Sequence, residues 1–334
     1  MKFKTVIAIL VSFASLSAAQ EKPIGYLSFE YINGQKEGEA PKGTFGNAQL
    51  GIVFSGEITD KFDYLAEVRY RENEVKVEQT WVRFKSSEAF SLSVGLYLVP
   101  FGKYNLFNRP HQTNLIKLPL SVKEMYPSSW RDIGVVLEGR MGSLFYTTYM
   151  GNGLGEGENL KTGQQFEDNN EDKAKGTRLG LFLSQQFVVA FSYYKGKYDD
   201  DNARNLTLKG ADLEWELEGV RILAEYSKAT LENPEPYSSG KAEGYFIQVS
   251  FNIDNLRPVV SYQNLEYKDP FHGPNFIKPF YSGLGISEDK NRWSFGFVYF
   301  PSQTLLFKFE YDYNRERLVE LENNTILAQV ALSF

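Results

Sequence analysis

The sequence predicts an antiparallel β-barrel that crosses a membrane, and three observations support this fold class. Apolar and polar residues alternate along most of the chain, as in strands with one face in lipid and one in water. The chain ends on such a strand, with one face formed by Ile326, Ala328, Val330, Leu332 and Phe334. It begins with the features of an export signal. A barrel in the outer membrane of a Gram-negative-type bacterium accounts for all three observations.

Residues 1–19 are expected to form a cleaved signal peptide. Lys2 and Lys4 give a basic start, residues 6–16 form an apolar run, and Ser17-Ala18-Ala19 is a small-residue cleavage site. The run is too short to cross a bilayer as a helix, which disfavours a membrane anchor. We therefore expect export through this signal and one mature domain, a barrel of residues 20–334.

The alternation predicts sixteen strands. Near the C-terminus, Phe307 and Phe309 share one face while Lys308 and Glu310 occupy the other. A face this charged cannot lie in a dry core but can line a water-filled lumen, although a soluble sheet with one wet face shows the same alternation. The strands are expected near 24–32, 45–57, 62–72, 75–85, 90–99, 132–140, 143–151, 177–185, 187–197, 206–217, 220–229, 242–253, 257–268, 291–300, 304–315 and 323–334. An even number is typical of single-chain bacterial barrels.

The connections between these strands alternate in length. Tight connections are expected at 58–61, 141–142, 185–186, 218–219, 254–255 and 301–303, and long ones at 33–44, 100–131, 152–176, 230–241 and 269–290. Outer-membrane barrels have short turns on the periplasmic side and long loops outside. The pattern therefore predicts which end of the barrel faces the exterior.

Composition excludes several classes of function. The chain has no Cys and only two His, so neither a thiolate metal site nor His-based catalysis is expected, and we predict no metal and no cofactor. Loss of Lys2 and Lys4 changes the formal net charge from −6 to −8, which disfavours nucleic-acid binding. The 15% aromatic content suits the aromatic girdles of a membrane barrel.

The connection at about 100–131 is the candidate for a constriction loop. It is the third outer loop and far longer than a usual connection. An outer loop in water has no reason to carry so many large apolar residues, so we expect it to fold inward against the barrel wall. Those apolar residues are Phe101, Tyr104, Leu106, Phe107, Leu115, Ile116, Leu118 and Leu120.

The same loop is basic, with five Lys or Arg residues against Glu124 alone. Basic groups in a narrow, partly desolvated constriction raise the local anion concentration. The open alternative is that these cations pair with acidic wall residues such as Glu138 or Glu67. The residues expected to line the pore and its constriction are Lys103, Arg109, Lys117, Lys123, Arg131, Arg69, Arg71, Glu138 and Arg140.

Two motifs flank the loop and carry a family resemblance. The segment Val94-Gly95-Leu96-Tyr97-Leu98-Val99-Pro100-Phe101-Gly102 precedes it, and Arg131-Asp132-Ile133-Gly134-Val135 follows it. In this order and spacing they resemble the phosphate-selective porin O/P family. The resemblance implies a sixteen-stranded, usually trimeric barrel that conducts small anions or other small polar solutes. Family members that select phosphate have a dense ladder of Arg and Lys along the pore wall. The expected lining here mixes acidic with basic residues and lacks that ladder, which argues against high-affinity phosphate binding and leaves general diffusion as the expectation.

We therefore expect an outer-membrane porin for passive diffusion of small hydrophilic solutes, with a preference for anions as the open question. The expected partners are small polar or anionic solutes, outer-membrane lipid and lipopolysaccharide, and two further copies of the chain in a homotrimer. The terminal strand ending at Phe334 is expected to engage the barrel-assembly machinery.

Other functions are weaker interpretations of the sequence. An outer-membrane hydrolase needs an activated nucleophile beside a base, and His111 and Ser121 share the third loop without an evident third partner. We therefore do not expect an enzyme. A structural or adhesive barrel would have a plugged lumen, and a hydrophobic-substrate transporter would have an N-terminal hatch for which little chain is left before the first strand.

Overall fold

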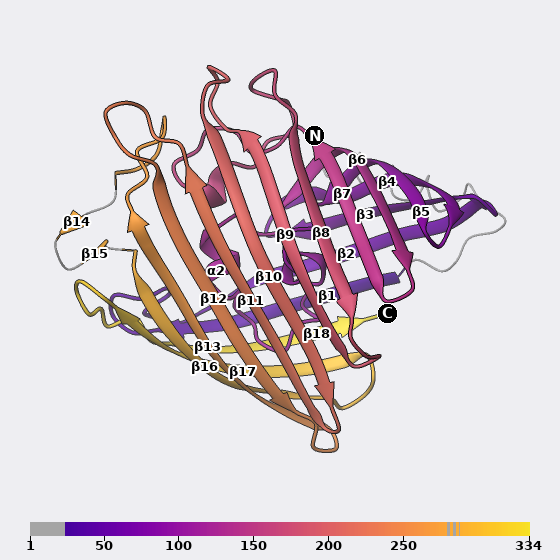
Figure 1. The fold of residues 1–334 in the computed structure, drawn as a ribbon. Coiled ribbons are helices and arrows are strands. Elements are labelled where there is room, and N and C mark those ends of the chain that lie inside the picture. Colours follow the sequence, from indigo (N-terminus) through magenta and orange to yellow (C-terminus); the bar gives the residue numbers. More distant parts are fainter. Residues whose placement is uncertain (1–23, 279–280, 283–284, 287) are drawn as a thin grey trace.

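The computed structural model describes residues 24–278, 281–282, 285–286 and 288–334, and in them sixteen antiparallel strands close a barrel (Figure 1). The predicted signal peptide and Gln20 lie outside the described residues. The barrel strands are β1 (Ile24–Gly34), β2 (Thr44–Thr59), β3 (Phe62–Arg71), β4 (Glu74–Ser87), β5 (Phe90–Leu98), β6 (Arg131–Met141), β7 (Leu144–Gly151), β8 (Ala174–Phe182), β9 (Phe187–Lys197), β10 (Asn205–Leu217), β11 (Val220–Leu231), β12 (Gly240–Phe251), β13 (Leu256–Asp269), β16 (Lys290–Tyr299), β17 (Leu305–Glu316) and β18 (Thr325–Ser333).

Each barrel strand pairs with its neighbours in sequence, and β1 closes the barrel by pairing with β18. The loop between β13 and β16 carries a separate small hairpin of β14 (Tyr281–Ser282) and β15 (Gly285–Ile286). Among the described residues, no helix is both long and apolar enough to cross a bilayer. The predicted all-β barrel of sixteen strands is confirmed.

Two predicted boundaries were wrong. The strand expected near 177–185 is β8, Ala174–Phe182, because the turn to β9 begins at Leu183, where the Leu183 N–H donates to the Phe187 carbonyl at 2.9 Å. Arg131 belongs to β6 and not to the preceding loop, since it pairs with Leu98 of β5. The long connection therefore spans residues 99–130.

Alternation along each strand separates the inside of the barrel from the outside. On β17, Lys308, Glu310 and Asp312 are buried and face inward, whereas Phe307 and Phe309 are exposed on the outer face. On β18 the set ending at Phe334 faces outward, with Ile326 44% exposed and Leu327 only 1%. The apolar faces predicted from the sequence therefore form the exterior, as lipid requires.

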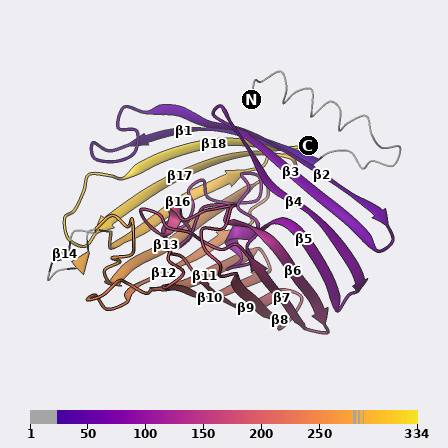
Figure 2. The ribbon, with the colours of Figure 1, turned by 90° about the horizontal axis from the view of Figure 1, so that it is seen from above.

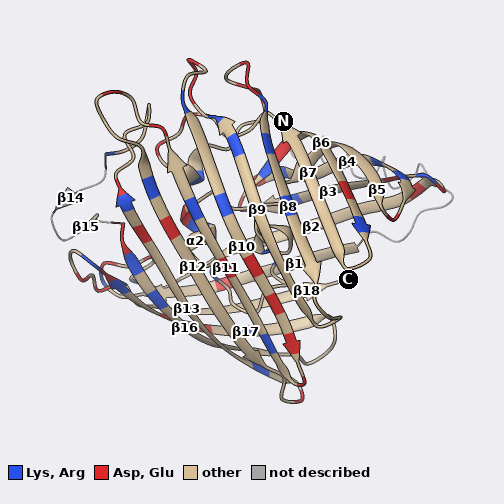
Figure 3. Cartoon of the chain, viewed as in Figure 1, with Lys and Arg blue, Asp and Glu red and all other residues tan. Residues whose placement is uncertain are grey.

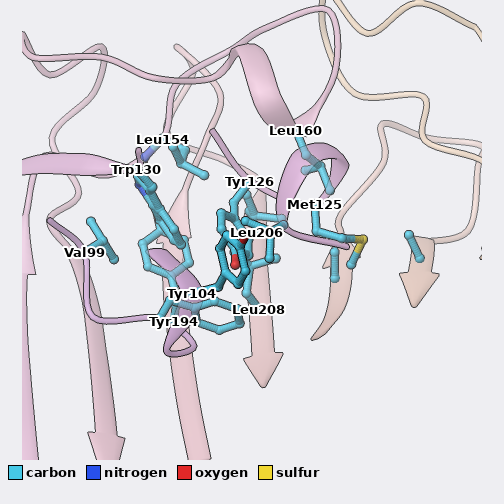
Figure 4. Close-up of a cluster of buried hydrophobic side chains, with 14 of the residues drawn as sticks. Val99, Tyr104, Met125, Tyr126, Trp130, Leu154, Leu160, Tyr194, Leu206 and Leu208 are labelled. Atoms are coloured by element: carbon cyan, nitrogen blue, oxygen red, sulfur yellow. Dashed lines mark hydrogen bonds between the residues drawn. The ribbon is translucent and has the colours of Figure 1, made fainter. Parts of the chain in front are cut away.

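The interior divides into two halves. Along β5 to β13, inward side chains join residues of the 99–130 segment in one buried apolar cluster (Figure 4). The wall of β1 to β3 with β17 and β18 instead presents mostly polar groups, including Ser28, Glu30, Glu67, Asp312 and Gln329. Seen from above, the 99–130 segment lies between these two walls (Figure 2).

Candidate functional site

Residues 99–130, here called the interior loop, join β5 to β6 and cross the inside of the barrel. They include two short helices, η1 (Tyr104–Leu106) and α2 (Leu120–Glu124). Their hydrogen bonds reach β3, β9, β11, β13 and β17, which lie on different sides of the closed barrel. A loop held from so many directions narrows the lumen at a fixed place.

The entry of the interior loop is held by β9 and β11. The Gly102 N–H donates to Ser192 Oγ at 3.1 Å, and the N–H groups of Lys103 and Tyr104 donate to Glu225 Oε2 at 3.0 and 3.1 Å. Gly102 has φ +64°, and a Cβ there would lie 2.3 Å from Glu225 Oε1. The motif therefore needs glycine at this position, both for its left-handed backbone and for the approach of the carboxylate.

The middle of the loop is held by the polar wall. Arg109 makes a two-pronged ion pair with Glu67 of β3, with Nε and Nη2 at 2.6 and 2.7 Å from the two carboxylate oxygens. On β17, Glu310 accepts hydrogen bonds from the N–H groups of Ile116 and Lys117. Arg109, Glu67 and Glu310 are all buried. These contacts fix Arg109 against β3 and the backbone of Lys117 against β17.

The return of the loop packs against apolar residues. Trp130 is fully buried, and its ring lies 5.9 Å from Phe101, 5.6 Å from Tyr126 and 4.9 Å from Tyr194 of β9, centroid to centroid (Figure 4). The Tyr126 hydroxyl donates to Glu225 Oε1 at 2.9 Å. The loop's two ends are thus joined through one buried carboxylate.

The second motif organises the next outer loop. Asp132 accepts hydrogen bonds from the N–H groups of Asn152 at 3.0 Å and Gly153 at 2.9 Å. A Cβ at Gly151 would lie 2.4 Å from the Asp132 carboxylate, so the site admits only glycine without displacement. Both motifs are therefore accounted for by the local backbone that leads into and out of the interior loop.

Between the interior loop and the polar wall lies a cavity of about 270 Å³. Its charged lining consists of Arg69, Arg71, Lys117, Lys123, Glu30 and Glu39. The wall side is supplied by β1, β2, β3 and β18, and the loop side includes Asn108, Pro110 and Ser128. Four cations and two anions therefore line the space in which the loop surface faces polar wall residues.

Ion pairing decides which of these charges act on a solute. Arg69 pairs with Glu78, and Lys117 lies 3.4 Å from Glu39 Oε2. Arg71 donates only to the Asn47 side-chain carbonyl, and Lys123 has no carboxylate within 4 Å among the described residues. Arg71 and Lys123, on opposite sides of the cavity, are therefore the lining cations without a carboxylate at ion-pair distance among the described residues, and Glu124 and Glu39 act on Lys123 only from farther away.

The anions have a different environment. Glu30 has no cation within ion-pair distance in the described part of the chain, but its two oxygens accept hydrogen bonds from Asn47 Nδ2 at 2.6 Å and Gln329 Nε2 at 2.7 Å. Hydrogen-bond donors directed at a carboxylate partly offset its negative charge. Glu39 is engaged by Lys117. The uncompensated lining is thus basic in balance.

Burial lowers the pKa of several loop residues, among them His111 and Lys123. Burial, together with the nearby Lys308 and Arg109, lowers the pKa of His111 to about 4, so the imidazole is neutral at neutral pH. Burial also lowers the pKa of Lys123, with Arg292 and Lys117 acting in the same direction and Glu124 and Glu39 against it. The positive charge of Lys123 is therefore held less firmly than that of a surface lysine.

The residues predicted to line the pore fall into three groups. Arg69, Arg71, Lys117 and Lys123 line the cavity. Lys103 and Arg109 are instead paired with the wall carboxylates Glu214 and Glu67, the alternative left open by the sequence. The other three lie elsewhere: Arg131 donates to the Val77 carbonyl, Glu138 pairs with Arg83, and Arg140 is at the turn between β6 and β7.

Several lining residues were missed from the sequence. Glu30 and Gln329 lie on the inward faces of β1 and β18, and Asn47 lies at a bulge of β2, yet nothing local in the sequence indicated that they would meet at one cavity. Glu39 comes from the loop between β1 and β2. Their meeting depends on barrel closure between β1 and β18, which pairs Glu30 with Gln329 across some three hundred residues of chain.

The interior loop also carries His111 and Ser121, the two residues considered for a hydrolase. Among the described hydrogen bonds, none joins His111 to Ser121, and the His111 ring instead lies 5.1 Å from that of Tyr26. In the part of the chain that the structure describes, no group of three His, Asp or Glu is arranged to hold a metal ion. What the site offers is a charged passage beside a fixed loop.

Comparison with known proteins agrees with this architecture. The family model described as Gram-negative porin matches residues 5–317. The chain belongs to the Gram-negative porin family. An uncharacterized protein of Aquifex aeolicus (strain VF5) is 23% identical over 347 aligned residues, which cover 90% of this porin and 77% of the relative.

Three solved barrels share the fold at low identity. Salmonella typhi OmpF in complex with daunomycin has a TM-score of 0.68 at 12% identity, covering 94% of this porin and 97% of that chain. The trimer form of Vibrio cholerae OmpT has a TM-score of 0.67 at 11% identity, with coverages of 95% and 100%. An anion-selective porin from Comamonas acidovorans has 0.66 at 9%, with coverages of 94% and 99%. Family and fold point to an outer-membrane channel and away from an enzyme.

Proposed function

We propose that this porin is a passive pore for small hydrophilic solutes and that its constriction prefers anions. The observation that carries the proposal is the cavity beside the interior loop, where Arg71 and Lys123 face the passage without a carboxylate partner among the described residues. Solutes would cross down their own gradients, and the fixed cations would concentrate anions in the narrowest, least hydrated part.

Planar-bilayer recording of the refolded protein tests this proposal. Under a potassium chloride gradient, the reversal potential of open steps should be directed to chloride. Lys123→Glu should lower the anion-to-cation permeability ratio about fivefold, since reversing a charge a few ångströms from the ion path changes its energy by about 1 kcal/mol after screening. Lys117→Glu should act less, because Lys117 is already beside Glu39.

Arg140→Glu is the matched control, because it makes the same charge change at the exposed turn between β6 and β7, away from the cavity. It should leave selectivity close to that of the parent. Open steps with a potassium-directed reversal would keep the pore and refute the anion preference. Folded protein without conductance would refute the pore itself.

We also propose that three copies assemble and that the mature chain begins at Gln20 after signal cleavage. A trimer form is known for the structurally similar OmpT of Vibrio cholerae, which supports the first proposal. Sedimentation of detergent-solubilised protein and the intact mass of protein from outer membranes test the two. Engagement of the barrel-assembly machinery by the strand ending at Phe334 is proposed on the outward apolar face of β18.

The resemblance of the two loop motifs to the phosphate-selective porin O/P family remains a prediction about the solute. The cavity holds no ladder of uncompensated cations: of its four, Arg69 and Lys117 are paired. We propose general diffusion of small anions, phosphate among them. Equal permeation by chloride and phosphate after correction for size would support this proposal, and saturation by phosphate at low concentration would contradict it.

A further inference from the structure

Four lysines form a row on the outer surface of the barrel. Lys175 of β8, Lys195 of β9, Lys209 of β10 and Lys228 of β11 alternate with buried, inward residues and therefore point outward. We call this set the lysine belt. Figure 3 shows basic segments on the loop-side halves of these adjacent strands.

Strand register brings the belt's charges close together. Lys175 is paired directly with Lys195, and Lys209 directly with Lys228. Lys195 pairs with Thr207, which places Lys209 on the adjoining diagonal. Like charges directly opposite on one sheet face are destabilising, so two such pairs side by side require a compensating anion.

The protein supplies little of that compensation. Lys228 pairs with Glu243 at 2.8 Å, but Lys175, Lys195 and Lys209 have no ion pair with any residue in the described ranges. The interior at this level is apolar, since Tyr194 and Leu208 are buried there. Any further compensating charge must therefore come from outside the barrel.

The outer loops above the belt do not supply it either. Asp199 is buried and pairs with Arg204 at 2.9 Å, and Asp168 pairs with Lys173. Asp172 accepts a hydrogen bond from the Lys197 N–H at 3.0 Å. These carboxylates are engaged in holding their own loops.

The belt lies where the lipid headgroups of the outer leaflet would be. It is near the strand ends that carry the long loops, with Tyr193 directly opposite Lys209 on the outer face. The outward residues farther from these loops are apolar, for example Phe191, which is 66% exposed, and Leu179. Aromatic residues mark the interface of membrane barrels, and lysines beside them extend their ammonium groups into the polar layer.

We propose that the lysine belt binds the phosphate groups of lipid A, the phosphorylated glycolipid of the outer leaflet. The four ammonium groups extend over three strand spacings, about 14 Å, so a headgroup with two separated phosphates engages both lysine pairs at once. This lipid site rests on the proposed outer-membrane location but not on the anion preference of the pore.

Native mass spectrometry of the full-length mature protein in detergent tests the site with lipid A as the probe. The triple variant Lys175→Gln, Lys195→Gln, Lys209→Gln should bind lipid A about a hundredfold more weakly, at about fivefold per charge removed. Lys241→Gln is the matched control, because Lys241 is also outward near the long loops but pairs with Asp269 at 3.0 Å. It should bind as the parent does.

Two further comparisons make the result decisive. The corresponding triple Arg variant keeps the charges and should keep binding, and lipid A without its phosphates should bind the parent as weakly as lipid A binds the Gln variant. Equal binding of the dephosphorylated lipid would overturn the proposal, as would equal loss in Lys241→Gln. If the Gln variant fails to fold, loss of parent binding with rising salt supports the site, and salt-independent binding refutes it. The belt variants should conduct as the parent does, because these lysines are on the outer surface, and this keeps the test separate from that of the pore.

Discussion

The two halves of the barrel interior differ in what fills them. Along β5 to β13, the interior loop packs as a protein core does, with Phe101, Tyr126 and Trp130 in contact with inward residues of the wall. Toward β1 to β3, β17 and β18, the loop makes hydrogen bonds and an ion pair across space that remains partly open. Both halves hold the loop, the first by apolar packing and the second by polar contacts that leave open space beside them.

The interior loop can therefore be held firmly in position and still leave an open passage beside it. Burial of large apolar and aromatic side chains supplies stability without requiring charged partners. Water can therefore occupy the opposite side, where the loop reaches the wall only through groups such as Arg109 and Lys117. The charge of the passage is then free to vary without loss of the loop's position.

Trp130→Ala should produce the largest effect, because it removes the side chain at the centre of the apolar half. The indole is 0% exposed and contacts three aromatic rings. Truncation of such a residue costs about 3–5 kcal/mol. Reversible urea unfolding in lipid vesicles should show this loss in the free energy of unfolding.

Trp215→Ala is the control for Trp130→Ala, since Trp215 is an equal side chain on the outer face and is 38% exposed. It should cost clearly less. If both substitutions lower the free energy of unfolding equally, the apolar half contributes no more to stability than the outer face of the barrel does. Noisy, enlarged conductance in Trp130→Ala alone would show that the loop has lost its position.

Much of the fold was predictable because it follows from period-two alternation. Phe307, Lys308 and Phe309 take opposite faces whatever the rest of the chain does, and lipid on one side decides which face is outside. The position of the interior loop was predicted from its apolar content alone. The strand boundary at β8 was not, because the turn at Leu183 depends on local hydrogen bonds without a strong sequence signal.

The charge of the site was less predictable because ion pairs join residues distant in sequence. The loop carries several similar cations, and sequence gives no means to tell Arg109, which pairs with Glu67, from Lys123, which forms no ion pair with a described carboxylate. The strand register of the barrel brings Glu67 to Arg109 and Glu214 to Lys103. The sequence near each residue does not contain this register, because it depends on how all sixteen strands close the barrel.

Glu225→Ala should have an intermediate effect, because it removes the carboxylate that joins the loop's two ends. The N–H groups of Lys103 and Tyr104 and the hydroxyl of Tyr126 would lose their acceptor in a buried place. Unsatisfied buried donors cost about 1–3 kcal/mol. Urea unfolding should show a loss in this range.

Glu243→Ala is the control for Glu225→Ala. Glu243 makes an outward ion pair with Lys228 on the neighbouring strand, and exposed pairs contribute about 0–1 kcal/mol. A loss as large in Glu243→Ala as in Glu225→Ala would mean that carboxylates anywhere on this wall stabilise equally. The apolar half would then have no special dependence on its buried acceptor.

The smallest effect is expected from pH, and it concerns only the polar half. Because burial lowers the pKa of Lys123, this side chain loses its charge below the ordinary lysine value of about 10.4 as pH rises. Loss of one positive charge from the cavity should lower the anion-to-cation permeability ratio about twofold, less than charge reversal does. Reversal potentials recorded at rising pH measure this change. Lys123→Arg stays charged and should remove this decline in the permeability ratio. A decline that persists in Lys123→Arg would come from another group and would place Lys123 outside the ion path.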